Sequence, residues 1–237
     1  MERFTSTFNC RICYFCVIFN IDLFMITIKT FVFGPFQENT YLLSDESKEC
    51  VIIDPGCYDS HEREELTDFI EANKLKPVKL LNTHCHLDHM FGNGFITETY
   101  KIKPEFDKNE QLVFDSYLPT ANIYNLEASP SSAPEKYLKE GDVIKFGNST
   151  LEIMSVPGHS PGSLTFFNRE QKFMIAGDVL FFGSIGRSDL PGGNHNTLIS
   201  SIQTKLVPLG DDYTVYSGHG KSTSIGFERM HNPFLNE

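Results

Sequence analysis

The chain has 237 residues, of which 40% are hydrophobic, so it is long enough for one large domain or two small ones. Its formal net charge of −11 argues against a nucleic-acid partner, because acidic groups repel a phosphate backbone. Six cysteines are too few for a disulfide-dense scaffold of this size. One of them, Cys85, lies inside a cluster of candidate metal ligands, so we expect a reducing, cytoplasmic location.

Residues 1–24 differ in composition from the rest and hold three of the six cysteines, spaced as Cys-x-x-Cys-x-x-Cys. Three thiols without a clear fourth ligand are a weak metal motif. The apolar run 12–28 is interrupted by Asn20 and Asp22, which makes it a poor transmembrane helix. Arg3 and Arg11 precede the run as in a weak signal peptide, but no small-residue cleavage site follows. We therefore predict that residues 1–24 are an upstream extension, that residues 25–237 form the catalytic domain, and that no membrane is a partner.

Strands bounded by turns dominate residues 25–82. Apolar, β-branched runs ending at Gly-Pro and Asp-Pro-Gly predict the first three strands. A helix follows, with Asp59 or Ser60 as its N-cap and with Leu66, Phe69 and Ile70 on its apolar face. The expected strands cover 27–33, 39–43, 50–53 and 78–82, and the helix precedes the last of them.

Four candidate metal ligands follow this last strand within six positions: His84, His86, Asp88 and His89. Imidazole and carboxylate groups are the expected ligands for zinc or iron. His84 and His86 are two residues apart, so in extended backbone they face the same way. Asp88 and His89 follow a bend and can face a second point nearby. The pattern predicts two adjacent metal ions rather than one.

Residues 98–140 are the least regular part of the sequence. Charged residues come first, aromatic residues and leucines follow, and the run 129–134 is rich in Ser and Pro. Long irregular connections are often functional. Two interpretations follow: a surface excursion between two halves of the domain, or a lid that shapes a substrate pocket.

In the second half, candidate ligands again follow strands. His159 lies in a tight Pro-Gly loop, Asp178 follows a strand that ends at Gly177, and His219 follows the last strand. Strand ends at one edge of a sandwich can converge, so these residues can join the first cluster. Strands interleaved with few helices predict an α/β fold of two sheets packed face to face, with helices outside. The expected strands cover 143–146, 150–156, 164–167, 172–176 and 213–216, and a helix is expected over 197–206.

Four motifs now resemble, in order and context, those of the metallo-β-lactamase superfamily. They are THCHLDH (83–89), PGHSPGS (157–163), AGDVLF (176–181) and SGHG (217–220). The resemblance extends from Met25 to the C-terminus. It implies a four-layer αββα sandwich with the metals at one edge of the sheets.

The resemblance also implies two divalent metal ions, zinc first and iron or manganese as alternatives. The implied ligands are His84, His86 and His159 for one ion, Asp88, His89 and His219 for the other, and Asp178 as a bridge. Asp88 has a second candidate role as proton acceptor. Asp54 matches a family aspartate near the site, with a structural role.

Two departures separate this chain from β-lactamases of the common zinc class, which usually carry Cys in place of Asp178 and Arg in place of His89. The glycine-rich loop 183–193 looks like that of small proteins similar to hydroxyacylglutathione hydrolase (glyoxalase II), without its helical glutathione-binding domain. This likeness implies a small-molecule partner, a thioester such as S-lactoylglutathione or a related hydroxyacyl thioester or ester. A hydroxide bridging the metals would attack it.

Arg187 is the candidate for binding a substrate carboxylate, because a guanidinium can hold a carboxylate with two bonds. The alternative is a structural tie between Arg187 and Asp189, and a third interpretation has Asp189 orienting a ligand histidine. Cys85 should point away from His84 and His86 by strand alternation, which predicts a packing role rather than a nucleophile.

Other activities use the same scaffold. A persulfide dioxygenase would hold one iron through the positions of His84, His159 and Asp178. A lactonase or a phosphodiesterase is the next alternative, because the metals alone do not choose the electrophile. A metal-bound module without catalysis is the last, and turnover that depends on the metal would exclude it.

Overall fold

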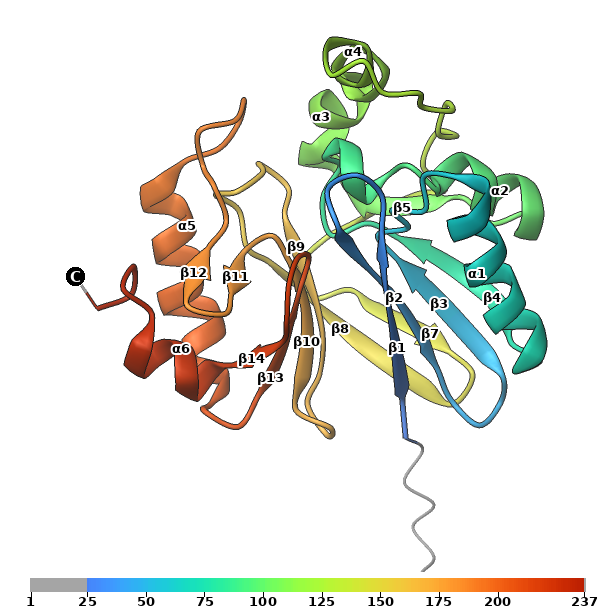
Figure 1. The fold of residues 1–237 in the computed structure, drawn as a ribbon. Helices are drawn as coiled ribbons and strands as arrows, with labels where there is room; N and C mark the ends of the chain where they lie inside the picture. The colour runs from blue at the N-terminus through green and yellow to red at the C-terminus, as the bar shows by residue number, and fades with distance from the viewer. Residues whose placement is uncertain (1–24, 237) are drawn as a thin grey trace, which may run out of the picture.

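The computed structural model describes residues 25–236, and Figure 1 shows two central sheets with helices on their outer faces. This arrangement confirms the predicted four-layer αββα sandwich. The segment 1–24, predicted to be an extension, lies outside the described residues. Within residues 25–236, the helices are too short or too polar to span a bilayer.

The first sheet contains six strands in sequence order: β1 (Thr27–Phe33), β2 (Glu38–Ser44), β3 (Glu49–Ile53), β4 (Lys76–Leu81), β5 (Pro104–Asp107) and β6 (Lys136–Leu138). β1, β2 and β3 pair antiparallel, whereas β3, β4, β5 and β6 pair parallel. Parallel strands bring their carboxyl ends to one edge, and it is there that the loop after β4 begins.

The second sheet is ordered β14-β13-β10-β9-β8-β7. Its strands are β7 (Val143–Phe146), β8 (Ser149–Ser155), β9 (Leu164–Asn168), β10 (Phe173–Gly177), β13 (Thr214–Ser217) and β14 (Thr223–Ser224). β10 and β13 are parallel, so Asp178 and His219 leave the sheet at the same edge. A separate hairpin pairs β11 (Leu180–Phe181) with β12 (Ser184–Ile185).

Helices cover the outer face of each sheet (Figure 1). The first sheet carries α1 (Ser60–Ala72) and α2 (Asn93–Tyr100), and the second carries α5 (His195–Ser201) and α6 (Ile225–His231). α5 continues as a π-helical segment, Ile202–Leu206. Two short helices, α3 (Gln111–Asp115) and α4 (Tyr117–Ile123), lie at the top of the view in Figure 1.

Side-chain alternation divides the core into layers. Val51 and Ile53 of β3 pack between the sheets with Phe166 of β9. Their neighbours Cys50 and Ile52 point the other way and pack under α1 and α2. Burying each large aliphatic or aromatic side chain stabilises the fold by roughly 1.5–3 kcal/mol, so the strand pattern itself holds the four layers together.

The strands and helices predicted from the sequence are present, with ends shifted by a residue or two for most of them. The description of residues 98–140 as irregular was wrong in part, because β5 and β6 extend the first sheet there and α3 and α4 form short helices. β5 has only four residues and begins with proline, so its sequence carries no clear alternation. The strand is buried because β4 and β6 lie on either side of it in the sheet. The helix α6 and the two-residue strands were also missed.

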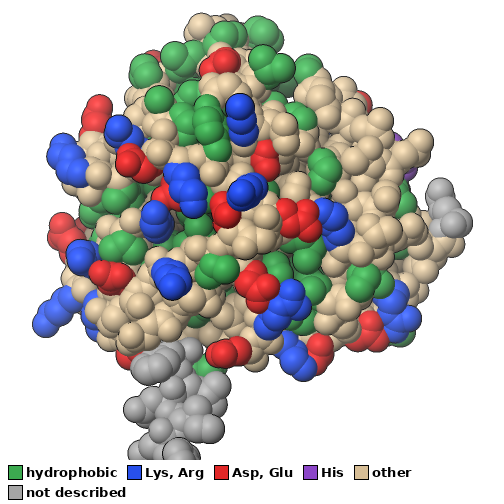
Figure 2. Space-filling view, turned by 180° about the vertical axis from the view of Figure 1, so that it is seen from behind, with side chains coloured by type: hydrophobic (Ala, Val, Ile, Leu, Met, Phe, Trp, Pro, Cys, Tyr) green, Lys and Arg blue, Asp and Glu red, His purple; other side chains and the backbone are tan. Residues whose placement is uncertain are grey.

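Acidic and basic side chains are interspersed over the face seen in Figure 2. Ion pairs on the surface of the described residues include Arg169 with Glu152 and Lys205 with Glu140. Exposed pairs of this kind contribute little to stability, about 0–1 kcal/mol each. This face has the mixed charge of an ordinary solvated surface.

Candidate metal centre

The loop after β4 aims its four candidate ligands at two points. His84 follows the buried Asn82 and Thr83, and a 3₁₀ turn at Leu87–His89 redirects the chain. The Asn82 side chain closes the loop by donating to the His89 carbonyl over 2.8 Å. The change of direction predicted between His86 and His89 is therefore present.

The first group of side chains consists of His84, His86 and His159, which offer nitrogen atoms within 4.8 Å of one another. His159 Nε2 lies 2.9 Å from His86 Nδ1 and 3.2 Å from His84 Nε2. Zinc–nitrogen bonds of about 2.0–2.1 Å in tetrahedral geometry place ligand nitrogens roughly 3.3 Å apart. The spacing of the three histidines fits one metal ion.

Hydrogen bonds fix the tautomers of two of these histidines. Thr83 Oγ1 donates to Asp54 Oδ2 over 2.6 Å, so it accepts the proton of His84 Nδ1, 3.0 Å away. The Arg187 carbonyl, 2.7 Å from His159 Nδ1, likewise requires a proton on that nitrogen. Each Nε2 therefore presents a lone pair toward the other, an arrangement that needs a shared cation.

The second group consists of Asp88, His89 and His219, again within 4.8 Å. His219 Nε2 lies 3.1 Å from Asp88 Oδ2, and His89 Nε2 lies 3.8 Å from the same oxygen. The other ring nitrogen of His219 faces the Gln37 carbonyl at 3.2 Å and donates to it, so the Nε2 lone pair again points at the centre.

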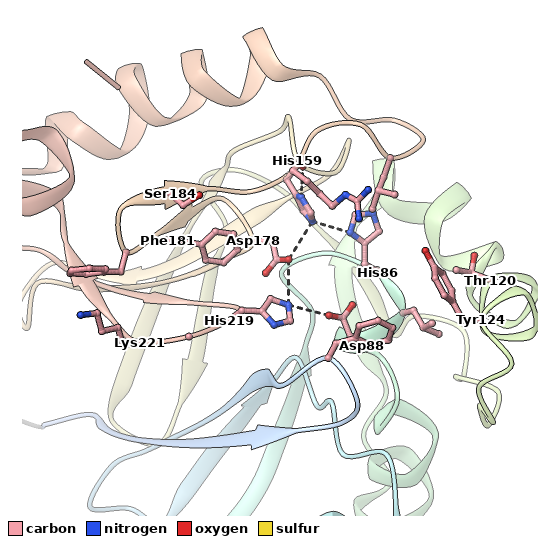
Figure 3. A pocket seen from close by; sticks show the side chains of 16 residues that line it. His86, Asp88, Thr120, Tyr124, His159, Asp178, Phe181, Ser184, His219 and Lys221 are labelled. Carbon is pink, nitrogen blue, oxygen red and sulfur yellow. Dashed lines mark hydrogen bonds and ion pairs between the residues drawn. The ribbon is translucent and has the colours of Figure 1, made fainter. Parts of the chain in front are cut away.

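Asp178 lies between the two groups (Figure 3). Its carboxylate is 3.4 Å from His89 Nε2, 3.6 Å from His159 Nε2 and 3.6 Å from His219 Nε2. Gly218 makes this approach possible, because a Cβ there would lie 2.1 Å from Asp178 Oδ1. Sequence analysis could not show that the ligands from both halves meet, and the structure brings all seven together.

Several buried polar atoms of this cluster lack a hydrogen-bond partner among residues 25–236. They include Asp178 Oδ1 and His89 Nε2. A buried polar atom without a partner is costly, about 1–3 kcal/mol, so such atoms are rare unless something else binds them. An unpartnered carboxylate oxygen beside an unpartnered imidazole nitrogen is a donor set that suits divalent transition metals.

The cluster strongly perturbs the pKa values of its members. Burial lowers the pKa of His84 well below its usual value and that of His86 to about 3, and their histidine neighbours add to the effect. Burial also lowers the pKa of His89, but the carboxylates of Asp88 and Asp178 outweigh it and the net shift is strongly upward. The histidines of the first group therefore stay neutral, as metal-ligating histidines must, whereas the carboxylates around His89 favour a positive charge there, which a bound metal ion would supply in place of the proton.

Asp54 helps to hold the candidate ligands in place, in line with the structural role that the family resemblance implied. It accepts two bonds from Thr83, from the backbone N–H over 2.7 Å and from the hydroxyl over 2.6 Å. Its Oδ2 is also 3.1 Å from His89 Nδ1. Asp54 therefore orients His84, through Thr83, and His89.

Glu110 and Asn39 are two supporting residues that sequence analysis missed. The buried Glu110 carboxylate accepts from Cys85 N over 2.8 Å and from Ser160 Oγ and Gly162 N over 2.6 Å each, so it ties the His84–His86 loop to the His159 loop. Asn39 Nδ2 donates to the carbonyls on either side of Gly218 and His219, those of Ser217 and Gly220. Both residues lie far from the ligands in sequence and carry no motif.

Cys85 points away from the cluster, as predicted. Its side chain is buried and packs with Met90, Phe91 and Phe106. Burial raises the pKa of its thiol well above the usual value, and the neighbouring Glu110 adds to the shift. A thiol that stays protonated is a poor nucleophile, so the structure confirms a packing role.

A cavity of about 740 Å³ opens beside the cluster, with Asp88, His159 and Asp178 in its wall. Aromatic and aliphatic side chains supply much of the remaining lining: Phe36, Leu87, Tyr124, Phe181, Phe182 and Leu190. Thr120 and Tyr124 come from α4 and the residue after it, so part of the segment 98–140 forms a pocket wall, as the lid interpretation required.

Arg187 also lines this cavity, but its guanidinium is paired. Arg187 Nε and Nη2 donate to the two carboxylate oxygens of Asp189 over 2.8 and 2.7 Å. The pairing lowers the pKa of Asp189 to about 2. The structure therefore contains the predicted tie between Arg187 and Asp189, while the Arg187 carbonyl rather than the Asp189 side chain holds His159.

Comparisons with known proteins agree with this fold. The family model of the metallo-beta-lactamase superfamily matches residues 33–219, so the chain belongs to that superfamily. It is 38% identical to hydroxyacylglutathione hydrolase GloC of Haemophilus influenzae over 219 residues, 92% of this chain and 98% of the relative. The chain is a metallohydrolase of this superfamily.

Two similar crystal structures extend the comparison. BLEG-1, described as a B3 metallo-beta-lactamase, matches with a TM-score of 0.81 and 33% identity, over 89% of this chain and all of that one. TTHA1623, in a di-iron-bound form, matches with a TM-score of 0.79 and 32% identity, over 87% of this chain and all of that one. The fold is thus shared, and a fold of this family implies divalent metal ions. GloC and BLEG-1 are named for different activities, and TTHA1623 is described with iron.

Proposed function

We propose that this chain is a binuclear metallohydrolase that cleaves acyl thioesters, with S-lactoylglutathione or a related hydroxyacyl thioester as substrate. The observation that carries the proposal is the pair of three-residue groups on either side of Asp178, at the wall of a cavity. The likeness to GloC supports the choice of a hydroxyacylglutathione thioester.

The proposed ligands are those whose lone pairs converge. His84, His86 and His159 would hold one ion, Asp88, His89 and His219 the other, and Asp178 would contact both. Zinc suits this nitrogen-rich set, and iron or manganese is the alternative, because TTHA1623 is described in a di-iron form. When bound, such ions lower the pKa of a water to about 7 and polarise a carbonyl.

The residues of the chain then have distinct tasks. Asp54 and Thr83 keep the imidazole of His84 oriented, and the Arg187 carbonyl does the same for His159. Asp88 reaches the cavity with its carboxylate and is the proposed proton acceptor. The apolar side chains around the cavity exclude water from the thioester once it is bound.

The test is elemental analysis of the purified protein together with hydrolysis assays. Two metal ions per chain with turnover of S-lactoylglutathione would support the proposal. One iron per chain, with oxygen uptake on glutathione persulfide and no thioester turnover, would instead identify a persulfide dioxygenase. A chromogenic β-lactam belongs in the same assay because of the likeness to BLEG-1, and faster turnover of it than of the thioester would refute the thioester assignment.

A further inference from the structure

The cavity contains two cationic side chains outside the metal centre, Arg187 and Lys221, and they differ in what neutralises them. The guanidinium of Arg187 already binds both oxygens of Asp189. To bind a substrate carboxylate it would have to exchange one carboxylate for another, with little net gain. Among residues 25–236, the Lys221 ammonium has no ion-pair partner and rests instead over the Phe182 ring, 3.4 Å from its centroid.

The backbone that carries Lys221 is fixed to the metal centre. Lys221 comes two residues after His219, and the Asn39 side chain donates to the Ser217 and Gly220 carbonyls over 2.9 and 2.8 Å. Asn39 is itself buried. A bond on each side of His219 fixes the backbone from which Lys221 extends, so the backbone next to the candidate ligand is already ordered when a substrate binds.

The aromatic hairpin completes this side of the cavity. Phe181 and Phe182 belong to the β11–β12 hairpin, and the buried Glu228 of α6 accepts the Gly183 N–H of its turn with both carboxylate oxygens. The ammonium held over Phe182 gains a cation–π contact, which limits its rotamers without neutralising its charge. In Figure 3, Lys221 lies at one end of the group of side chains, and Thr120 and Tyr124 lie at the other.

We propose that Lys221 is the specificity-determining residue that binds an anionic group, a carboxylate, on the thiol arm of the substrate. The thioester carbonyl would lie over the metal centre, and the arm would run past Phe181 and Phe182 to the ammonium. The inference deepens the proposed thioester hydrolysis and rests on it. It moves the recognition of substrate charge from Arg187, the residue that the sequence suggested, to Lys221.

The experiment separates charge recognition from turnover. Steady-state kinetics of the full chain compare S-lactoylglutathione, which carries carboxylates on its thiol arm, with S-lactoyl-N-acetylcysteamine, which is uncharged. Lys221→Met removes the ammonium and keeps much of the stem. Arg187→Met removes the competing cation, and Lys145→Met removes an equal charge from an exposed position on β7, away from the cavity. Lys221→Arg restores the charge.

We expect Lys221→Met to raise KM for S-lactoylglutathione roughly ten-fold, which corresponds to about 1.4 kcal/mol, with kcat nearly unchanged. The uncharged thioester should show no such rise, and Lys221→Arg should behave like the wild type. Added salt should raise KM for S-lactoylglutathione in the wild type but not in Lys221→Met. Lys145→Met should change KM by less than about two-fold, and Arg187→Met should raise KM for S-lactoylglutathione less than Lys221→Met does.

Three results would overturn the inference. An unchanged KM in Lys221→Met would do so, as would a larger effect in Arg187→Met. A larger effect of Lys221→Met on S-lactoyl-coenzyme A than on S-lactoylglutathione would show that a phosphate, not a carboxylate, is recognised. A wild type that hydrolyses neither thioester would refute the proposed function. Calorimetric binding of S-hexylglutathione, which cannot be hydrolysed, then still tests whether Lys221→Met loses affinity.

Discussion

Glu110 links the two loops that meet at the metal centre. Its Oε1 accepts from Ser160 Oγ and Gly162 N, and its Oε2 accepts from Cys85 N, which lies between His84 and His86. Glu110→Gln preserves the shape of the side chain and can preserve the acceptor that faces Ser160. It places an amide N–H₂ against the Cys85 N–H, so that two donors face each other.

The expected loss of stability in Glu110→Gln follows from these contacts. A hydrogen bond to a charged group contributes about 1.5–3 kcal/mol, and a buried donor without a partner costs about 1–3 kcal/mol. Burial raises the pKa of Glu110, so the neutral amide avoids a desolvation cost that the carboxylate bears. We therefore expect a loss of about 2 kcal/mol in the free energy of unfolding. Displacement of the histidine loop should weaken metal binding about 10- to 100-fold.

The assay combines urea unfolding of the metal-free protein with zinc titration against a chromophoric chelator. Glu105→Gln is the matched control, because Glu105 is also a buried carboxylate, on β5, but pairs with Lys79 rather than with the ligand loops. It should lose stability and keep the zinc affinity of the wild type. Equal zinc affinity in Glu110→Gln and Glu105→Gln would refute the proposed coupling of the two loops.

The remaining predictions concern three other aspartate and cysteine positions. Asp178→Ala should lose most bound metal and thioester turnover, since this carboxylate faces both groups; full activity with two ions per chain would contradict the bridging role. Cys85→Ala should keep turnover within about three-fold while its cavity costs about 1 kcal/mol of stability; loss of turnover in a folded, metal-loaded variant would make the thiol catalytic. Burial raises the pKa of Asp45, but the hydroxyl and backbone N–H donors around it outweigh burial and the net shift is downward. Its stabilisation is therefore present above the unfolded pKa of about 3.9 and lost as pH falls through the lower folded pKa, so Asp45→Asn should be less stable at pH 7 and have a flatter acid limb in urea unfolding.

The sequence could predict the layers of the fold because each central strand is buried on at least one face. Val51 and Ile53 alternate with Cys50 and Ile52. The first two pack between the sheets, and the other two pack under α1 and α2. This reasoning fails for β5, because neighbouring elements bury its four residues although their sequence shows no alternation of apolar and polar residues. Short strands and helices that depend on tertiary contacts show no hydrophobic periodicity in the sequence.

The candidate ligands were identifiable because imidazoles and carboxylates followed strand ends in a recognisable order. Their supports were not, since Glu110 and Asn39 act through bonds to backbone atoms of distant loops. Arg187 shows a second limit. Its motif suggested substrate recognition, but its partner Asp189 stands two residues away, and only the geometry shows that both guanidinium bonds are taken.

The contacts around Asn39 and His219 bear on when the centre can form during synthesis. Asn39 of β2 bonds to Ser217 of β13, 178 positions later, and His219 bonds to the Gln37 carbonyl, 182 positions away. The His84–His89 loop therefore emerges from the ribosome long before the strand that completes its surroundings. Pairings this distant in sequence form late in folding. A nascent chain would therefore lack His219 at the second group until β13 docks, and that group would be completed only as the sandwich closes.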